Sequence, residues 1–285
     1  MPAAYGAAVR VTFCGVRGST SAPGPEFVRF GGHTSCLAVA PDGSAPVLLL
    51  DAGTGIRNVT ELVGDGPFRG TILLTHLHWD HVQGLPFFTA GDRDDAEITV
   101  AMPAQGDPAT VLAGAMAPPH FPITPEGLRG RWSFAGLERG RHTFEGCDVL
   151  AAEVPHKGGR TYGYRVSAGG RSLAYLPDHG PLGCGPGPDG LGARHPAALA
   201  LAEGADLLVH GAQFTAAEQG LAADFGHATV DYAVALAEEA AVGRLVLFHH
   251  APGRTDEQVD GVARAAASST TVPLVAAAEG LSLDV

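Results

Sequence analysis

Residue types that bind metal ions gather in the stretch THLHWDH, residues 75–81. The spacing is H-x-H-x-D-H, with donors His76, His78, Asp80 and His81. In extended backbone, residues two apart point to the same side, so His76 and His78 can bind one ion together. The following turn would bring Asp80 and His81 to a second position. Imidazole and carboxylate groups are ligands for zinc, and also for iron or manganese. The alternative is a polar strand end in which Asp80 caps a helix, but four such residues favour a metal site.

Two metal positions need further donors from elsewhere in the chain. The candidates at the ends of expected strands are His156, Asp178 and either His249 or His250. Singly, each histidine could be hydrogen-bonded or exposed without binding metal. Together, their types and positions are those that a binuclear site requires.

The elements that would position these donors alternate between strands and helices. Apolar runs predict strands at 9–15, 34–40, 46–50, 70–76, 96–103, 147–156, 161–168, 171–178, 205–213, 244–252 and 273–285. Helices are expected at 56–63, 81–88, 107–117, 197–204, 229–240 and 255–268. No linker interrupts the chain, so we expect one α/β domain over 1–285 with two similar halves, roughly 1–146 and 147–285. Donors at strand ends occupy the usual place for sites on α/β scaffolds.

Composition limits the partners of the chain. The formal net charge is −12 and no run of Lys or Arg occurs, which argues against binding long nucleic acid. Small anionic substrates stay possible because bound divalent ions would offset the charge locally. No apolar run is long enough for a membrane span, no secretory signal is evident, and the four cysteines form no C-x-x-C pair. A cytoplasmic protein is expected.

The chain resembles metallo-β-lactamase-fold hydrolases over essentially its whole length. The resemblance rests on H-x-H-x-D-H together with GVRGST, GGHTSC, LLLDAGTGIR, HKGGRTYGYR, VHGAQFT, FGHAT and LFHHAPGR. These motifs resemble the branch that contains ribonuclease Z and the small bacterial cyclic phosphodiesterases. The resemblance implies an αββα four-layer sandwich with the site in a cleft along the sheet edges.

The resemblance also implies a role for each donor. His76, His78 and His156 would hold one metal ion, and Asp80, His81 and a late histidine would hold the other, with Asp178 bridging both. The family pattern at FHHAPGR favours His249 over His250, and regular strand alternation lets only one of them face the cleft.

Asp51 matches an early family aspartate that orients a ligand histidine without binding metal itself. A turn-forming aspartate before glycine is its alternative interpretation.

Two ions, expected to be zinc with manganese or iron as alternatives, would activate a bridging water and clamp the attacking and leaving oxygens. No serine or cysteine nucleophile is then required. Asp80 and His227 are the catalytic candidates. His227 resembles the proton donor of ribonuclease Z-like enzymes, although Ala228 replaces the usual serine. It could instead be a histidine at a helix start, with Thr229 as the N-cap.

Two cations are candidates for binding an anionic substrate. Lys157 and Arg160 follow His156 in a glycine-bearing loop, where either could contact a phosphate oxygen. A solvated hairpin turn is the equally reasonable alternative. Trp79 and the segment PPHFPITP, residues 118–125, could form a wall of the pocket, although aromatic residues there are more often packing residues.

Three function classes compete. A phosphodiesterase for small or cyclic phosphate esters fits the motifs best. A thioester or lactone hydrolase on the same metal core is the second, and a redox di-iron or non-catalytic metal protein is the third. His78 favours hydrolysis, because redox members of the family carry glutamate there.

Several positions depart from the family pattern. The chain has His33 where asparagine is usual and Gly211 where aspartate is common, and it lacks the Thr-Glu that commonly follows the bridging aspartate. These departures leave the substrate open. No long basic insertion is present, which disfavours processing of transfer RNA 3′ ends. A homodimer is expected from the family.

Overall fold

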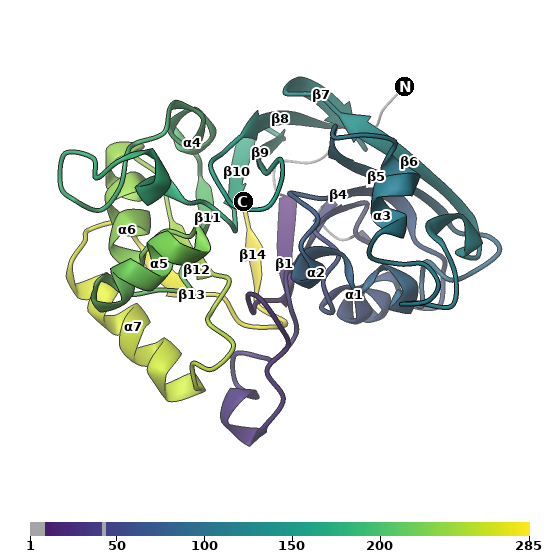
Figure 1. The fold of residues 1–285 in the computed structure, drawn as a ribbon, viewed down its shortest axis with the longest axis horizontal. Coiled ribbons are helices and arrows are strands. Elements are labelled where there is room, and N and C mark those ends of the chain that lie inside the picture. Colours follow the sequence, from purple (N-terminus) through teal and green to yellow (C-terminus); the bar gives the residue numbers. More distant parts are fainter. Residues whose placement is uncertain (1–8, 42–43) are drawn as a thin grey trace.

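Two seven-stranded sheets packed face to face form the centre of the computed structural model, which describes residues 9–41 and 44–285 (Figure 1). The first sheet has the order β14-β1-β2-β3-β4-β5-β6. Its strands are β1 (Val9–Gly15), β2 (Cys36–Pro41), β3 (Leu48–Leu50), β4 (Arg69–Leu73), β5 (Glu97–Pro103), β6 (Arg131–Leu137) and β14 (Ser282–Asp284). Strands β3 to β6 are parallel, and β1 pairs antiparallel with both of its neighbours.

The second sheet has the order β13-β12-β11-β10-β9-β8-β7. Its strands are β7 (Gly140–Phe144), β8 (Cys147–Glu153), β9 (Tyr162–Ala168), β10 (Arg171–Leu176), β11 (Leu207–Gly211), β12 (Leu245–Phe248) and β13 (Leu274–Ala276). Strands β10 to β13 are parallel, and β7, β8 and β9 form antiparallel pairs. The chain therefore passes from the first sheet to the second between β6 and β7.

Apolar side chains from both sheets fill the space between them. Phe13 of β1 lies 6.0 Å from Phe248 of β12 between ring centroids, and Tyr175 of β10 lies 5.7 Å from Phe248. All three are fully buried. This shared core locks the two sheets together, because separating them would expose large aromatic surfaces to water.

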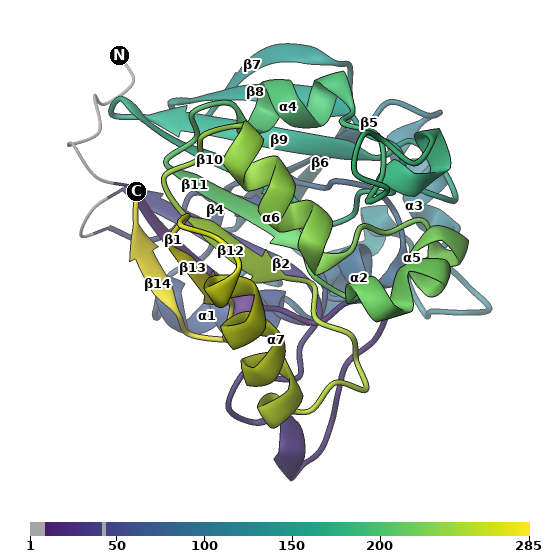
Figure 2. The ribbon, with the colours of Figure 1, turned by 90° about the vertical axis from the view of Figure 1, so that its left-hand side faces the viewer.

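Helices cover the outer face of each sheet. The first sheet carries α1 (Ile56–Val63), α2 (Trp79–Val82) and α3 (Pro108–Ala113). The second carries α4 (Pro196–Ala202), α5 (Gln219–Phe225), α6 (Val230–Glu239) and α7 (Asp256–Ser268), of which α4, α6 and α7 lie in front of it in Figure 2. The layers run helix, sheet, sheet, helix, which confirms the αββα sandwich. No helix in the described ranges has the length and apolar character needed to cross a bilayer.

Two sequence-based element predictions are wrong. The single helix expected at 81–88 is instead α2 followed by the 3₁₀ turn Leu85–Phe87, because Gly84 and Pro86 interrupt the helical hydrogen bonding. The single strand expected at 273–285 is divided between β13 in the second sheet and β14 in the first (Figure 1).

Among the strands and α-helices of the described residues, the strands β6 and β7 and the helix α5 were not predicted at all. Strand β6 lies at a sheet edge, and most of its side chains are exposed or half-buried, so no run of apolar residues marks it in the sequence.

Candidate metal centre

The segments that carry the predicted donors converge at one end of the sandwich. Residues 76–81 follow β4, His156 follows β8, Asp178 follows β10 and His249 directly follows β12. The carboxyl ends of parallel strands meet at one edge of a sheet. The described residues form four clusters of potential metal donors, which all lie here, and three of the four combine residues from both sheets.

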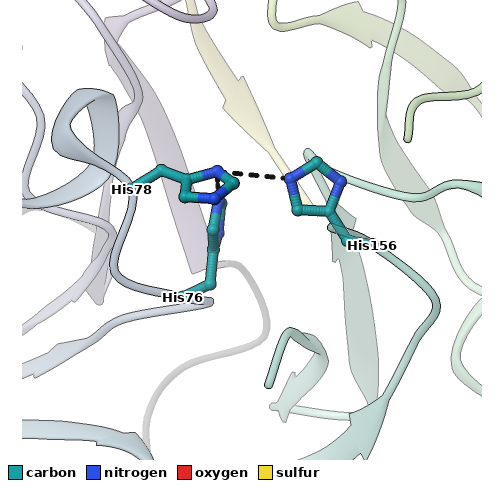
Figure 3. Close-up of side chains that lie close together, drawn as sticks. All are labelled: His76, His78 and His156. Carbon is teal, nitrogen blue, oxygen red and sulfur yellow. Dashed lines mark hydrogen bonds between the residues drawn. The ribbon is translucent and has the colours of Figure 1, made fainter. Parts of the chain in front are cut away.

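One cluster consists of three histidines (Figure 3). His76 Nε2 lies 2.9 Å from His78 Nδ1, and His156 Nε2 lies 3.3 Å from the same atom. Ligand atoms on a tetrahedral zinc ion are roughly 3.3 Å apart, given bonds of about 2.0–2.1 Å. The spacing therefore suits nitrogens that share one ion. Burial lowers the pKa of His76 and of His78, which favours the neutral ring that binds metal.

A second cluster consists of Asp80, His81 and His249. His249 Nε2 lies 3.1 Å from Asp80 Oδ2 and 3.3 Å from His81 Nε2, and His81 Nε2 lies 3.3 Å from Asp80 Oδ2. Burial would raise the pKa of Asp80, but the charge of His81 and the hydrogen bond with His249 outweigh it and lower that pKa far below its usual value. Asp80 is therefore a carboxylate, the form that binds a cation.

Asp178 lies between the two clusters. Its Oδ2 is 3.0 Å from His81 Nε2 and 3.4 Å from His249 Nε2, while its Oδ1 is 3.7 Å from His156 Nε2. Oδ2 is buried and has no hydrogen-bond partner. An orphaned buried carboxylate oxygen among imidazole nitrogens fits a metal ligand, which an ion would satisfy.

Hydrogen bonds on the side away from the cluster orient the imidazole rings of His81 and His156. His81 Nδ1 lies 2.8 Å from Asp51 Oδ2, and His156 Nδ1 lies 2.6 Å from the Gly226 carbonyl oxygen. A neutral ring with its proton on Nδ1 donates to this acceptor, and its Nε2 lone pair then points into the cluster.

Asp51 is held by several donors. It accepts hydrogen bonds from the Thr75 amide (2.7 Å) and the Tyr175 hydroxyl (2.9 Å), and its φ is +61°. A positive φ costs a non-glycine residue free energy, and this conformation persists where the surrounding contacts hold it in place. Its contact with His81 is the one expected of a carboxylate that orients a ligand.

The two adjacent histidines after β12 point in different directions. His249 has φ +56° and faces Asp80, whereas His250 Nε2 donates to the Ala277 carbonyl oxygen at 2.9 Å. The structure thus brings His249, and not His250, to the cluster. The turn in the backbone at His249 separates the two rings, so regular strand alternation does not apply there.

A cavity of about 740 Å³ opens over the clusters. His227 lines it, with Nδ1 3.4 Å from Asp178 Oδ1. Burial lowers the pKa of His227 to about 3, so the ring is neutral at pH 7. Thr229 is also the N-cap of α6, which was the alternative interpretation of this segment. Its Oγ1 accepts a hydrogen bond from the Tyr232 amide at 3.2 Å. The two roles are compatible.

The two predicted substrate-binding cations do not line this cavity. Lys157 Nζ donates to the Asp224 carbonyl oxygen. Arg160 pairs with Glu153 at 3.1 Å and also donates to the Ala104 carbonyl oxygen. Both side chains are engaged in contacts within the protein, because nearby acceptors satisfy their donors.

Two further polar residues that sequence reasoning did not single out also line the cavity. The Ser19 amide donates to Asp80 Oδ2 at 2.6 Å, and Gln213 Nε2 donates to Ser19 Oγ at 3.1 Å. Both lie in motifs that carried the family resemblance, GVRGST and VHGAQFT. Their polar side chains were the available signal, but their spacing from the histidines in sequence hides the contact.

Comparison with known proteins identifies the family of this chain. The family described as "Beta-lactamase superfamily domain" matches residues 47–250. A ribonuclease Z from Synechococcus sp. (strain WH7803) is 30% identical, covering 97% of this chain and 96% of the relative. The chain therefore belongs to the metallo-β-lactamase superfamily of metal-binding hydrolases, in its ribonuclease Z-like branch, as the motifs indicated.

Solved structures share the fold. The metallo-beta-lactamase fold protein YhfI from Bacillus subtilis superposes with a TM-score of 0.69 at 17% identity, covering 98% of this chain and 99% of the other. The Zn²⁺-bound PqqB from Methylobacterium extorquens also has a TM-score of 0.69, at 21% identity, covering 97% and 100%.

Proposed function

We propose that this protein is a phosphodiesterase with a binuclear metal centre, acting on small or cyclic phosphate esters. His76, His78 and His156 would hold one ion, and Asp80, His81 and His249 the other. The observation that carries the proposal is Asp178, whose two oxygens face different clusters. A carboxylate in that position suits a bridge between two cations.

Bound divalent ions, with zinc the first candidate, would supply a nucleophilic water near neutral pH and neutralise charge on the phosphoryl oxygens. The side chains of the protein do the rest. Asp51 keeps the His81 ring oriented, and the Ser19 amide does the same for the Asp80 carboxylate. His227 faces the cavity as a neutral ring, and an approaching phosphate anion would raise its pKa. It could then hold the proton that the leaving oxygen needs.

The substrate class follows from three observations. The relative with 30% identity is named ribonuclease Z, whose name implies cleavage of phosphodiesters. The cavity of about 740 Å³ suits a small molecule. The net charge of −12 opposes binding of long nucleic acid, so we propose a small anionic ester.

The test combines metal analysis with a substrate panel. Protein purified without chelator should carry two equivalents of zinc, manganese or iron per chain and hydrolyse bis-p-nitrophenyl phosphate or a cyclic phosphate. EDTA should abolish turnover, and added Zn²⁺ or Mn²⁺ should restore it. Less than one equivalent of metal would refute the metal centre. Metal-loaded protein that cleaves only thioesters or lactones would refute the phosphodiesterase assignment.

A further inference from the structure

A second cavity, of about 530 Å³, lies beside the cavity over the metal centre, and Trp79 lines both. It is enclosed by α2, the turn at 85–87, α3 and the segment that follows α3. Its walls include Val82, Leu85, Phe87, Met116, Phe121 and Phe134. Among the described residues that line it, none is a lysine, arginine, aspartate or glutamate. We call it the aromatic pocket.

The aromatic pocket presents unusually exposed rings. Trp79 is 73% exposed and Phe87 is 56% exposed, while Phe87 makes an edge-to-face contact with Phe121 at 5.9 Å between centroids. Large exposed aromatic side chains that line a concave surface mark a binding site, since covering them removes apolar area from water. The location of Trp79 between the two cavities connects this apolar surface to the metal centre.

We propose that the aromatic pocket binds an uncharged aromatic ring on one ester arm of the substrate, while the phosphate lies at the metal centre. This inference rests on the proposed phosphodiesterase function. A ring is favoured over an alkyl chain because the walls supply aromatic edges and faces and the Met116 sulfur, which interact favourably with a ring beyond simple burial. The lining has no lysine, arginine, aspartate or glutamate to pair with an ionised arm, and His120 is its one titratable side chain, so an uncharged arm is favoured.

The first experiment compares two substrates that differ only in the retained arm: methyl p-nitrophenyl phosphate and benzyl p-nitrophenyl phosphate. In both, the water oxygen bonds to phosphorus and the bond to the p-nitrophenyl oxygen breaks. The products are the monoester and p-nitrophenolate, and the protons of the water pass to the medium. Both substrates release the same leaving group, so the ratio of their kcat/KM values measures the contribution of the retained arm. We expect the benzyl ester to be at least tenfold better, and a ratio near one would overturn the inference.

Variants locate the preference in the pocket. Ala115 lines the aromatic pocket and is half-buried, so Ala115→Phe should fill it and bring the benzyl-to-methyl ratio close to one. Ala217→Phe adds the same ring to an exposed position beside α6 and α7 and should keep the ratio. Phe87→Ser changes a mostly exposed side chain and should lower the ratio several-fold, which tests the pocket even if Ala115→Phe does not fold. An unchanged ratio in both pocket variants would refute the location.

A binding measurement separates this inference from the proposed function. The chain has two tryptophans, so Trp132→Phe leaves Trp79 as the fluorescent reporter. The uncharged quencher p-nitrobenzyl alcohol should quench it with a saturable curve that Ala115→Phe abolishes. If no phosphodiester is cleaved but quenching saturates, the proposed function fails and the ring site stands. Linear, purely collisional quenching would overturn the ring site.

Discussion

Single residues behind the metal centre decide which nitrogen each histidine presents. Asp51 accepts a hydrogen bond from His81 Nδ1, and the Gly226 carbonyl accepts one from His156 Nδ1. A ring without such a partner could turn or take the other tautomer, which would remove the lone pair from the cluster.

Replacing Asp51 with asparagine should weaken metal binding by about 10–100-fold. The amide keeps the shape of the side chain but loses the charge that favours the His81 proton on Nδ1. Competition with a chromogenic chelator measures the affinity. Asp148→Asn, at an exposed position on β8, is the matched control and should bind metal normally. Equal affinities in the two variants would show that Asp51 only shapes the turn.

Replacing His227 with glutamine should lower kcat for phosphodiesters by about 10²–10⁴-fold while metal content stays unchanged. The side chain lines the cavity but is not needed to complete either cluster. Metal analysis and steady-state kinetics on the same preparation check both points. His142→Gln, on β7, should leave both quantities as they are. Turnover that persists in His227→Gln would assign proton transfer to another group.

At the scale of elements, loops after strands place the donors, and close packing limits what those loops tolerate. Gly158, in the loop after β8, has φ +87°, and a Cβ there would lie 2.6 Å from His78 Nε2. Gly170, in the turn between β9 and β10, has φ +80° with nothing within 4 Å of the same position.

This pair separates backbone strain from obstruction of the site. Gly158→Ala and Gly170→Ala should each lower the free energy of unfolding by about 1–2 kcal/mol, because both force alanine into a left-handed conformation. Only Gly158→Ala should also reduce metal affinity, since its methyl group displaces His78. Denaturant unfolding and metal titration measure the two effects. A normal metal affinity for Gly158→Ala would mean that the loop moves aside.

At the scale of the whole molecule, burying neutral histidines makes stability depend on pH. Burial lowers the pKa of His210 and of His250 to about 4, against 6.5 for a free ring. Between these values the unfolded chain binds protons that the folded protein does not, so stability falls as pH falls through this window.

For each of these two histidines, lowering the pH from 7.5 to 5 should lower the free energy of unfolding by about 2 kcal/mol. Urea unfolding in excess EDTA measures the loss without a contribution from metal release. His210→Gln should flatten the dependence by about that amount, and His142→Gln should not change it. Equal slopes for His210→Gln and the unmodified protein would show that folding leaves the pKa of His210 unchanged. The homodimer implied by the family stays a prediction.

Local patterns in the sequence were sufficient to predict alternating strands and helices and the donors in residues 76–81, while the sandwich fold was implied by the resemblance to the family. His76, His78, Asp80 and His81 lie within six positions, so short-range geometry alone relates them. The family motifs added the donors on distant strands. Weakly apolar edge strands such as β6 left no comparable signal.

Long-range contacts decided the remainder. The last segment divides between two sheets, and Arg160 pairs with Glu153 and the Ala104 carbonyl rather than facing the cavity. His249 faces the cluster because the backbone turns at a positive φ, while His250 is held by the Ala277 carbonyl across the chain. The sequence by itself determined which donors and which scaffold are present. The direction of each side chain and the existence of the aromatic pocket depend on segments that meet only after folding, so the tertiary structure decided them.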